Sequence, residues 1–239
     1  MRSIIKYVPK LQSLQMTFEW SKIDEEGIRT ISENLRKFQI LKRLTLGFPS
    51  SKNITDCCLE FLFKGISNLL SLQELKLNLS ELYSCFSEGH PVLQCFSAMI
   101  SRLKGLQKLS IGLAGCQLIN NDSIQTMFQA ISSLPNLKFA EFGLQYCGRL
   151  GKSGYEAISN AVSRFNQLDY LILKFSNSLK FDDSSVSIFK EGISRLSNLK
   201  SLKFDISECY GLTSKAFKDI KFLLKSLLNL VEFEILADE

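Results

Sequence analysis

The residues that could perform chemistry in this chain of 239 residues are one histidine and seven cysteines. A histidine can activate a neighbouring cysteine or serine as a nucleophile, and clustered cysteines can bind zinc or form disulfides. His90 is the lone histidine, no C-x-x-C pair occurs, and no partner that would complete a catalytic triad is identifiable. We therefore expect a protein that is not an enzyme, with no catalytic residues, no metal site and no cofactor.

Two other patterns resemble functional motifs but favour a structural interpretation. Gly151-Lys152-Ser153 resembles the end of a phosphate-binding loop, but Tyr146 stands where the leading glycine is required. The acidic pairs Glu25-Glu26 and Asp182-Asp183 lie where we expect helices to begin, and the helix dipole favours carboxylates there. We interpret all three as helix starts.

The pattern LxxLxLxF recurs eight times along the chain. The elements that position the residues above must therefore belong to a repeated unit. Its first leucines are Leu11, Leu41, Leu72, Leu106, Leu137, Leu168, Leu199 and Leu230, at intervals of 30 to 34 residues. Apolar residues at offsets 3, 5 and 7 alternate as in a strand with one buried face. A second apolar set, 13, 10, 6 and 3 residues before the next first leucine, has the spacing of one helix face. Each unit therefore predicts a strand followed by a helix.

Small polar residues are expected to begin the helices and to line the turns. Candidate helix caps are Asp56, Asn121 or Asp122, Ser153, Asp183 and Ser214. Another register, 21 residues before the next first leucine, holds Ser51, Cys85, Cys116, Cys147, Ser178 and Cys209. Serine shares this register, so we favour a ladder of side chains that satisfies backbone groups at each turn. A disulfide between Cys116 and Cys147, or a metal site, is the less favoured alternative.

One unit departs from the repeat. Three residues are added between Leu79 and Leu93, and Glu88 stands where other units carry an apolar residue. We expect this insertion to form a longer surface loop around His90.

Repeated LxxLxLxF strands, each returned by a helix, resemble the leucine-rich repeat family in its ribonuclease-inhibitor-like class. The resemblance covers essentially the whole chain, although the usual Asn or Cys shortly after the last strand leucine is missing. It implies an α/β fold that is an open right-handed solenoid, a horseshoe or arc, with a parallel sheet on the concave side and helices on the convex side. The alternative with the same number of units is a closed barrel of eight strands and eight helices. The identical leucine register in every unit argues against that barrel.

We expect one domain over residues 1–239, with about seven full units of roughly 31 residues. A partial helix carrying Ile5 and Val8 precedes the first strand, and the chain ends on a final strand. Solenoids normally need polar capping repeats, and none is visible. The sequence thus predicts either a piece of a longer chain or self-association through uncapped ends.

The concave face should expose offsets 2, 4 and 6 of each strand. Most of these residues are polar or charged, but Phe139, Tyr170 and Ile172 are apolar and lie in adjacent units. Lys108, Glu141 and Lys174 surround them. An apolar centre with a charged rim is the layout of a protein-binding hot spot, which we predict here. Scattered exposed apolar residues are common, however, and Phe139 has the alternative of turning inward beside the small Ala140.

Composition restricts the partner further. The net charge is +5 with both signs interspersed, so neither a nucleic-acid nor a membrane partner is indicated. An odd number of cysteines in a long chain without a secretory signal favours a cytoplasmic, intracellular location. We predict a non-catalytic protein-protein interaction scaffold that binds a protein or peptide on its concave face. Alternatives are the recognition segment of a larger signalling enzyme, such as a kinase or ubiquitin ligase, and an inhibitor of a partner enzyme, as the resemblance implies.

Overall fold

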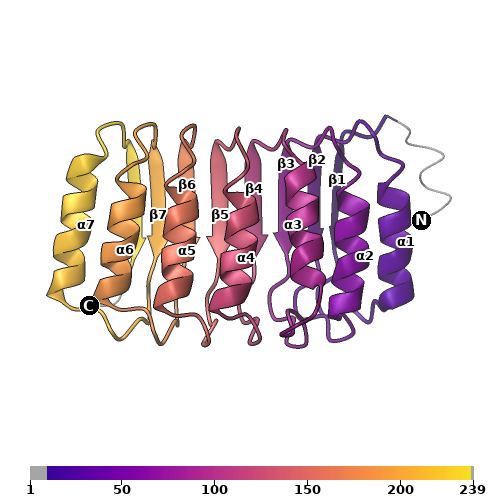
Figure 1. Ribbon diagram of the computed structural model, residues 1–239, viewed down its shortest axis with the longest axis horizontal. Coiled ribbons are helices and arrows are strands. Elements are labelled where there is room, and N and C mark those ends of the chain that lie inside the picture. Colours follow the sequence, from indigo (N-terminus) through magenta and orange to yellow (C-terminus); the bar gives the residue numbers. More distant parts are fainter. Residues whose placement is uncertain (1–9, 238–239) are drawn as a thin grey trace.

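The structure is a computed structural model that describes residues 10–237. Strands and helices alternate along these residues (Figure 1). The strands are β1 (Ser13–Thr17), β2 (Arg43–Gly47), β3 (Glu74–Asn78), β4 (Lys108–Gly112), β5 (Phe139–Gly143), β6 (Tyr170–Lys174), β7 (Ser201–Asp205) and β8 (Glu232–Leu236). The helices are α1 (Glu25–Leu35), α2 (Asp56–Ile66), α3 (Val92–Arg102), α4 (Asn121–Ile131), α5 (Lys152–Val162), α6 (Asp183–Ile193) and α7 (Ser214–Ser226).

All eight strands form one parallel sheet in the order of the sequence. Each strand pairs with the next without any offset, so that Phe139 lies opposite Tyr170 and Tyr170 lies opposite Ser201. The edges of the sheet are β1 and β8, which do not pair with each other. The open solenoid is therefore confirmed, and the closed barrel is excluded.

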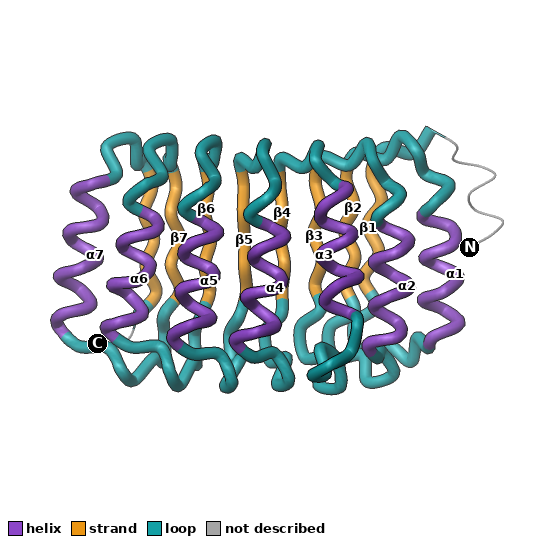
Figure 2. Tube along the Cα trace, in the orientation of Figure 1, coloured by secondary structure: helices purple, strands orange, loops and turns teal. Residues whose placement is uncertain are grey.

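The helices form a second layer on one face of the sheet (Figure 2). Their row is visibly wider than the row of strands (Figure 1). This difference follows from spacing, because paired strands lie about 4.8 Å apart while packed helices need about 8–10 Å. The sheet consequently lies on the inner, concave side and the helices on the convex side, as the sequence predicted.

The repeated leucines and the helix faces form one continuous core between the two layers. Leu41, Leu72, Leu106, Leu137, Leu168 and Leu199 are all at most 1% exposed. Aromatic rings fill the C-terminal half, where Tyr155 packs edge-on against Phe175 and Phe181 at centroid distances of 5.5 and 5.1 Å. Because every unit buries its strand and its helix against its neighbours, the fold depends on stacking rather than on any single unit.

The ninth position after each first leucine adopts a left-handed backbone conformation. The residues are Trp20, Ser50, Glu81, Gly115, Tyr146, Asn177 and Glu208, with φ between 51° and 70°. The peptide nitrogens of the first six donate to a carbonyl of the following unit, as from Ser50 to Ser80 at 3.0 Å. Only one of the seven is glycine, so most units accept a strained conformation that these hydrogen bonds hold in place.

The helix caps differ from the sequence prediction by one or two residues. Helices α1, α4 and α6 are capped by Asp24, Asn120 and Asp182. Each of these side chains accepts a hydrogen bond from the backbone nitrogen three residues later. The predicted caps Asn121 and Asp183 are instead the first helical residues, and each bonds the start of the next helix. Asn121 accepts from the backbone nitrogen of Gly151, the N-cap of α5, at 2.9 Å. The pattern of polar residues was right, but their partners lie in the neighbouring unit.

The inserted segment between β3 and α3 is not simply a surface loop. Leu82 and Phe86 within it are each 1% exposed, so Phe86 supplies the apolar contact that Glu88 cannot. The shift also places Val92 in the core and leaves the predicted core residue Leu93 only partly buried. The carboxylate of Asp56 in α2 accepts hydrogen bonds from the backbone nitrogens of Phe86 and Ser87 at 2.5 and 2.9 Å.

Five of the six residues in the cysteine register form the predicted ladder, whereas the buried hydroxyl of Ser178 has no hydrogen-bond partner among the described residues. The thiols of Cys85, Cys116, Cys147 and Cys209 donate to the carbonyls of Ile54, Leu79, Leu113 and Phe175 at 3.1 to 3.3 Å. Ser51 does the same to Phe18 at 2.8 Å. None of the seven cysteines forms a disulfide, so the disulfide alternative is wrong.

The C-terminal end leaves apolar surface uncovered. Phe217 is 45% exposed, although the residues at the same place in α2, α4, α5 and α6 are buried. Leu228 and Val231, in the turn between α7 and β8, are even more exposed. The partial helix predicted around Ile5 and Val8 lies outside the described residues.

Candidate protein-binding surface

The three apolar residues predicted as a binding centre lie together on the concave face. Phe139 and Tyr170 occupy facing positions of β5 and β6, and their ring centroids are 6.4 Å apart with planes tilted by 34°. Tyr170 is 45% exposed, while Phe139 and Ile172 are partly exposed. Phe139 does not turn inward beside Ala140, because its side chain lines the concave surface with the other two. We call these three residues the apolar centre.

The apolar centre borders a hollow that the sequence did not single out. A depression of about 210 Å³ is lined by Phe139, Tyr170, Ile172, Ser201, Leu202, Lys203, Glu232 and Glu234. The polar lining residues come from offsets 2 and 4 of the last two strands. They were missed because each looks like an ordinary solvated residue, and only the in-register sheet places them beside Tyr170.

Two further depressions extend along the same face. One, of about 440 Å³, reaches from β1 to Phe139 and includes Arg43, Glu74 and Lys108. The other, of about 220 Å³, lies near the carboxyl ends of β3 to β6 and includes Lys76, Glu141 and Lys174. Phe139 therefore lines two hollows. Of the predicted charged residues, Lys108 lines the larger of these two, and Glu141 and Lys174 line the depression near the strand ends.

The charged residues around the apolar centre are paired across neighbouring strands. Lys174 Nζ lies 2.5 Å from Glu141 Oε1, and Lys108 Nζ lies 3.1 Å from Glu74 Oε1. A third pair joins Lys203 to Glu234 at 2.6 Å. Pairing across the sheet fixes these side chains and leaves no strong net charge beside the apolar centre.

Glu141 is the most perturbed acid of this surface. Burial raises the pKa of its carboxyl, but hydrogen bonding and charge from Lys174, with smaller effects of Lys76 and Ser110, outweigh burial. The net pKa lies below the ordinary value, so Glu141 is ionised at neutral pH.

Comparison with known proteins finds similar structures but no similar sequence. No protein-family model matches the sequence, and no curated protein sequence matches it either. Among solved structures, a tropomodulin C-terminal domain from Caenorhabditis elegans aligns with a TM-score of 0.45 at 15% identity, covering 68% of this chain and 91% of that one. The leiomodin-1 actin-binding site 2 aligns with a TM-score of 0.41 at 14% identity, covering 81% of this chain and 85% of that one.

Two other kinds of site are absent from the described residues. Between residues 10 and 237, no group of three or more His, Cys, Asp or Glu side chains is placed to hold a metal ion. Over the same range, no helix is both long and apolar enough to cross a bilayer.

Proposed function

We propose that this protein is a non-catalytic scaffold that binds a protein or peptide segment on its concave face, across β5 to β8. The observation that carries the proposal is the apolar centre, where Phe139, Tyr170 and Ile172 stay accessible beside a hollow on a mostly polar sheet face. Aromatic side chains at the middle of a surface, ringed by polar groups, supply most of the energy of many protein interfaces.

The surroundings indicate the chemistry of the partner. The hollow beside Tyr170 is small enough for one apolar side chain. Its wall carries the ion pair of Lys203 with Glu234 and a second acid, Glu232. A partner that inserts an aliphatic or aromatic side chain and flanks it with polar groups fits this arrangement better than a strongly charged polymer does. A reducing, cytoplasmic environment fits a chain whose seven cysteines form no disulfide.

The test is selection of ligands from an unbiased peptide-display library, followed by binding measurements on purified variants. Tyr170→Glu places a charge in the apolar centre, and Thr45→Glu places the same charge on β2 of the same face. The proposal expects selected ligands to lose binding to the first variant and to keep binding to the second. Ligands that bind Tyr170→Glu as tightly as the wild type would show that recognition uses another surface.

We also propose that copies of the chain associate head to tail through the two ends of the solenoid. At the N-terminal end, a depression of about 400 Å³ combines the apolar Phe18 and Ile23 with the acidic Asp24 and Glu26. At the C-terminal end, α7 combines the exposed Phe217 with lysines. These lysines are Lys215, Lys218, Lys221 and Lys225, all of them exposed. Opposite charges around apolar surface favour contact between unlike ends, which is a heterologous arrangement.

A further inference from the structure

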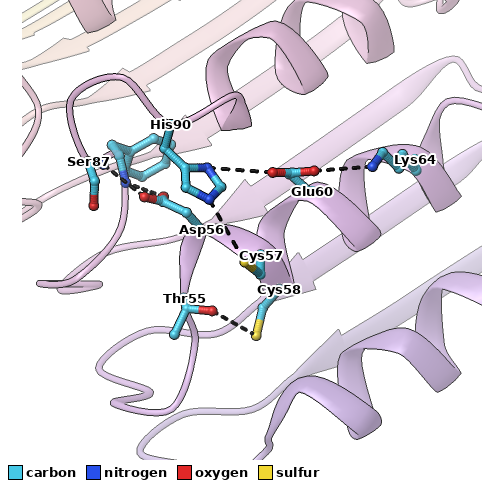
Figure 3. A network of polar contacts seen from close by, with 9 residues as sticks. Thr55, Asp56, Cys57, Cys58, Glu60, Lys64, Ser87 and His90 are labelled. Carbon is cyan, nitrogen blue, oxygen red and sulfur yellow. Dashed lines mark hydrogen bonds and ion pairs between the residues drawn. The ribbon is translucent and has the colours of Figure 1, made fainter.

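The surroundings of Cys57 differ from those of the buried cysteines in the ladder. Cys57 is exposed and is the second residue of α2. Its sulfur lies 3.8 Å from Nε2 of His90, within hydrogen-bonding distance for sulfur (Figure 3). The solitary histidine of the chain thus faces an accessible thiol, although 33 residues separate the two in sequence.

The inserted segment is what brings His90 to this place. It contains the three residues that the other units lack, and Asp56 anchors it through the backbone nitrogens of Phe86 and Ser87. The backbone nitrogen of His90 then donates to the carbonyl of Ser87 at 3.2 Å. Figure 3 shows the imidazole lying over α2, between Cys57 and Glu60.

Glu60 lies on the other side of the imidazole. Its Oε1 is 3.5 Å from His90 Nδ1, an ion-pair distance without hydrogen-bond alignment. Nδ1 is buried and has no hydrogen-bond partner, so Glu60 becomes its natural counter-ion when the ring is protonated. Lys64 also pairs with Glu60, at 3.1 Å. The imidazole of His90 thus lies between a thiol that it can deprotonate and a carboxylate that can balance its charge.

Other thiols of the chain do not share this arrangement. Burial raises the pKa of Cys116 and of Cys147 to about 12, so both remain protonated donors of the ladder. Burial and the charge of Glu60 likewise raise the pKa of Cys95, a half-buried thiol on α3. Cys95 therefore offers an internal comparison on the neighbouring helix.

We propose that Cys57 is a modification site whose thiol is activated by His90 for exchange with low-molecular-weight disulfides such as glutathione disulfide. His90 Nε2 takes the thiol proton, and the Cys57 sulfur attacks one sulfur of the disulfide. The S–S bond of the small molecule breaks as a mixed disulfide forms on Cys57, and the departing thiolate takes the proton back from His90. Cys57 is oxidised, the departing sulfur is reduced to a thiol, and no other reactant is needed.

The position of Cys57 adds to this proposal in two ways. A thiolate at the beginning of a helix is favoured by the helix dipole, and an exposed thiol can be reached by a small disulfide. The charged groups that face the pair are Glu60, Asp56 and Lys64 of α2, and Cys95 of α3 is the titratable group packed beside them. Glu60 opposes a thiolate by its charge but stabilises the protonated imidazole that forms beside it.

The experiment measures the rate of mixed-disulfide formation with glutathione disulfide, resolved by peptide mass spectrometry, in the full chain. At about pH 7 we expect Cys57 to react about ten times faster than Cys95, and about ten times faster than Cys57 in the His90→Asn variant. At about pH 9.5, where a thiol ionises without help, the effect of His90→Asn should shrink to about twofold or less. Cys57→Ser should remove the fast adduct.

The matched control is Glu88→Gln, an exposed change in the same inserted segment, which should leave the rate at Cys57 unchanged. A disturbed loop would slow Cys57 in His90→Asn equally at both pH values, whereas loss of a base slows it only at the lower one. Equal slowing at both values, or an unchanged rate at about pH 7, would overturn the proposal.

Discussion

Glu141 and Lys174 join β5 to β6 through an ion pair of 2.5 Å at the edge of the apolar centre. The Glu141 carboxyl is partly buried, and after the opposing effect of burial its partners still hold its pKa below the ordinary value of 4.5. The pair thus links the stability of the sheet to pH at the place where we expect a partner to bind.

The sign of this pH dependence follows from the depressed pKa. A carboxyl with a lower pKa in the folded state stabilises the fold above its unfolded pKa and loses that contribution as pH falls through the folded value. We expect the wild type to lose more free energy of unfolding than Glu141→Gln between about pH 6 and about pH 3, measured by urea denaturation. Equal losses in the two proteins would show that the ion pair contributes nothing to stability.

Replacing Tyr146 by glycine should stabilise the protein. Tyr146 has φ of 59°, and its side chain is 58% exposed, so glycine relieves the left-handed strain and gives up little packing. We expect a gain of about 0.5–1 kcal/mol in the free energy of unfolding. Gly115→Ala at the same position of another unit should cost a similar amount, because a Cβ there would meet Glu81 Cγ at 3.1 Å. The prediction fails if both variants shift stability in the same direction.

Asp183 should matter more than an acid one position further into a helix. Its carboxylate accepts hydrogen bonds from Thr213 N at 2.8 Å and Thr213 Oγ1 at 2.6 Å, and so joins the start of α6 to the start of α7. Asp183→Ala should lower the free energy of unfolding by about 1–2 kcal/mol. Asp122→Ala, in the first turn of α4, removes a similar dipole interaction and should cost about 0.5 kcal/mol. Thermal or urea unfolding compares the two directly.

Head-to-tail association predicts a charge-reversal pattern. Lys221→Glu with Lys225→Glu should lower the apparent mass measured by light scattering at high protein concentration, because like charges would then meet at the contact. Adding Asp24→Lys and Glu26→Lys to the same chain should restore the mass. A wild type that stays monomeric at every concentration, or a reversal without effect, would contradict the proposed contact.

The repeat made the architecture accessible from the sequence, since one leucine pattern specifies both the strand and the helix face of every unit. The cysteine ladder could be predicted for the same reason, because serine and cysteine share one register of the repeat. The sequence pattern did not predict which side chains bond between units. The sequence predicts Asn121 and Asp183 as caps of their own helices. In the structure, parallel stacking lets their side chains accept hydrogen bonds from the following unit.

The candidate site shows the same division. The alternation of Phe139, Tyr170 and Ile172 with buried leucines indicated that they face outward on adjacent strands. Their contribution to a shared hollow with Ser201 and Glu232 depends on pairing in register, which a single strand does not encode. The neighbourhood of Cys57 and His90 was missed because it arises from an insertion whose path is set by the burial of Phe86.

The most direct test of the account is the dissociation constant of a library-selected ligand for the wild type, Tyr170→Glu and Thr45→Glu, measured by titration calorimetry with melting temperatures alongside. We expect Tyr170→Glu to weaken binding by about 30-fold or more, as for a hot spot worth about 2 kcal/mol. Its melting temperature should stay within about 2 °C of the wild type, because exposed substitutions change stability little. Thr45→Glu should bind like the wild type. Unchanged binding by Tyr170→Glu would contradict recognition through the apolar centre.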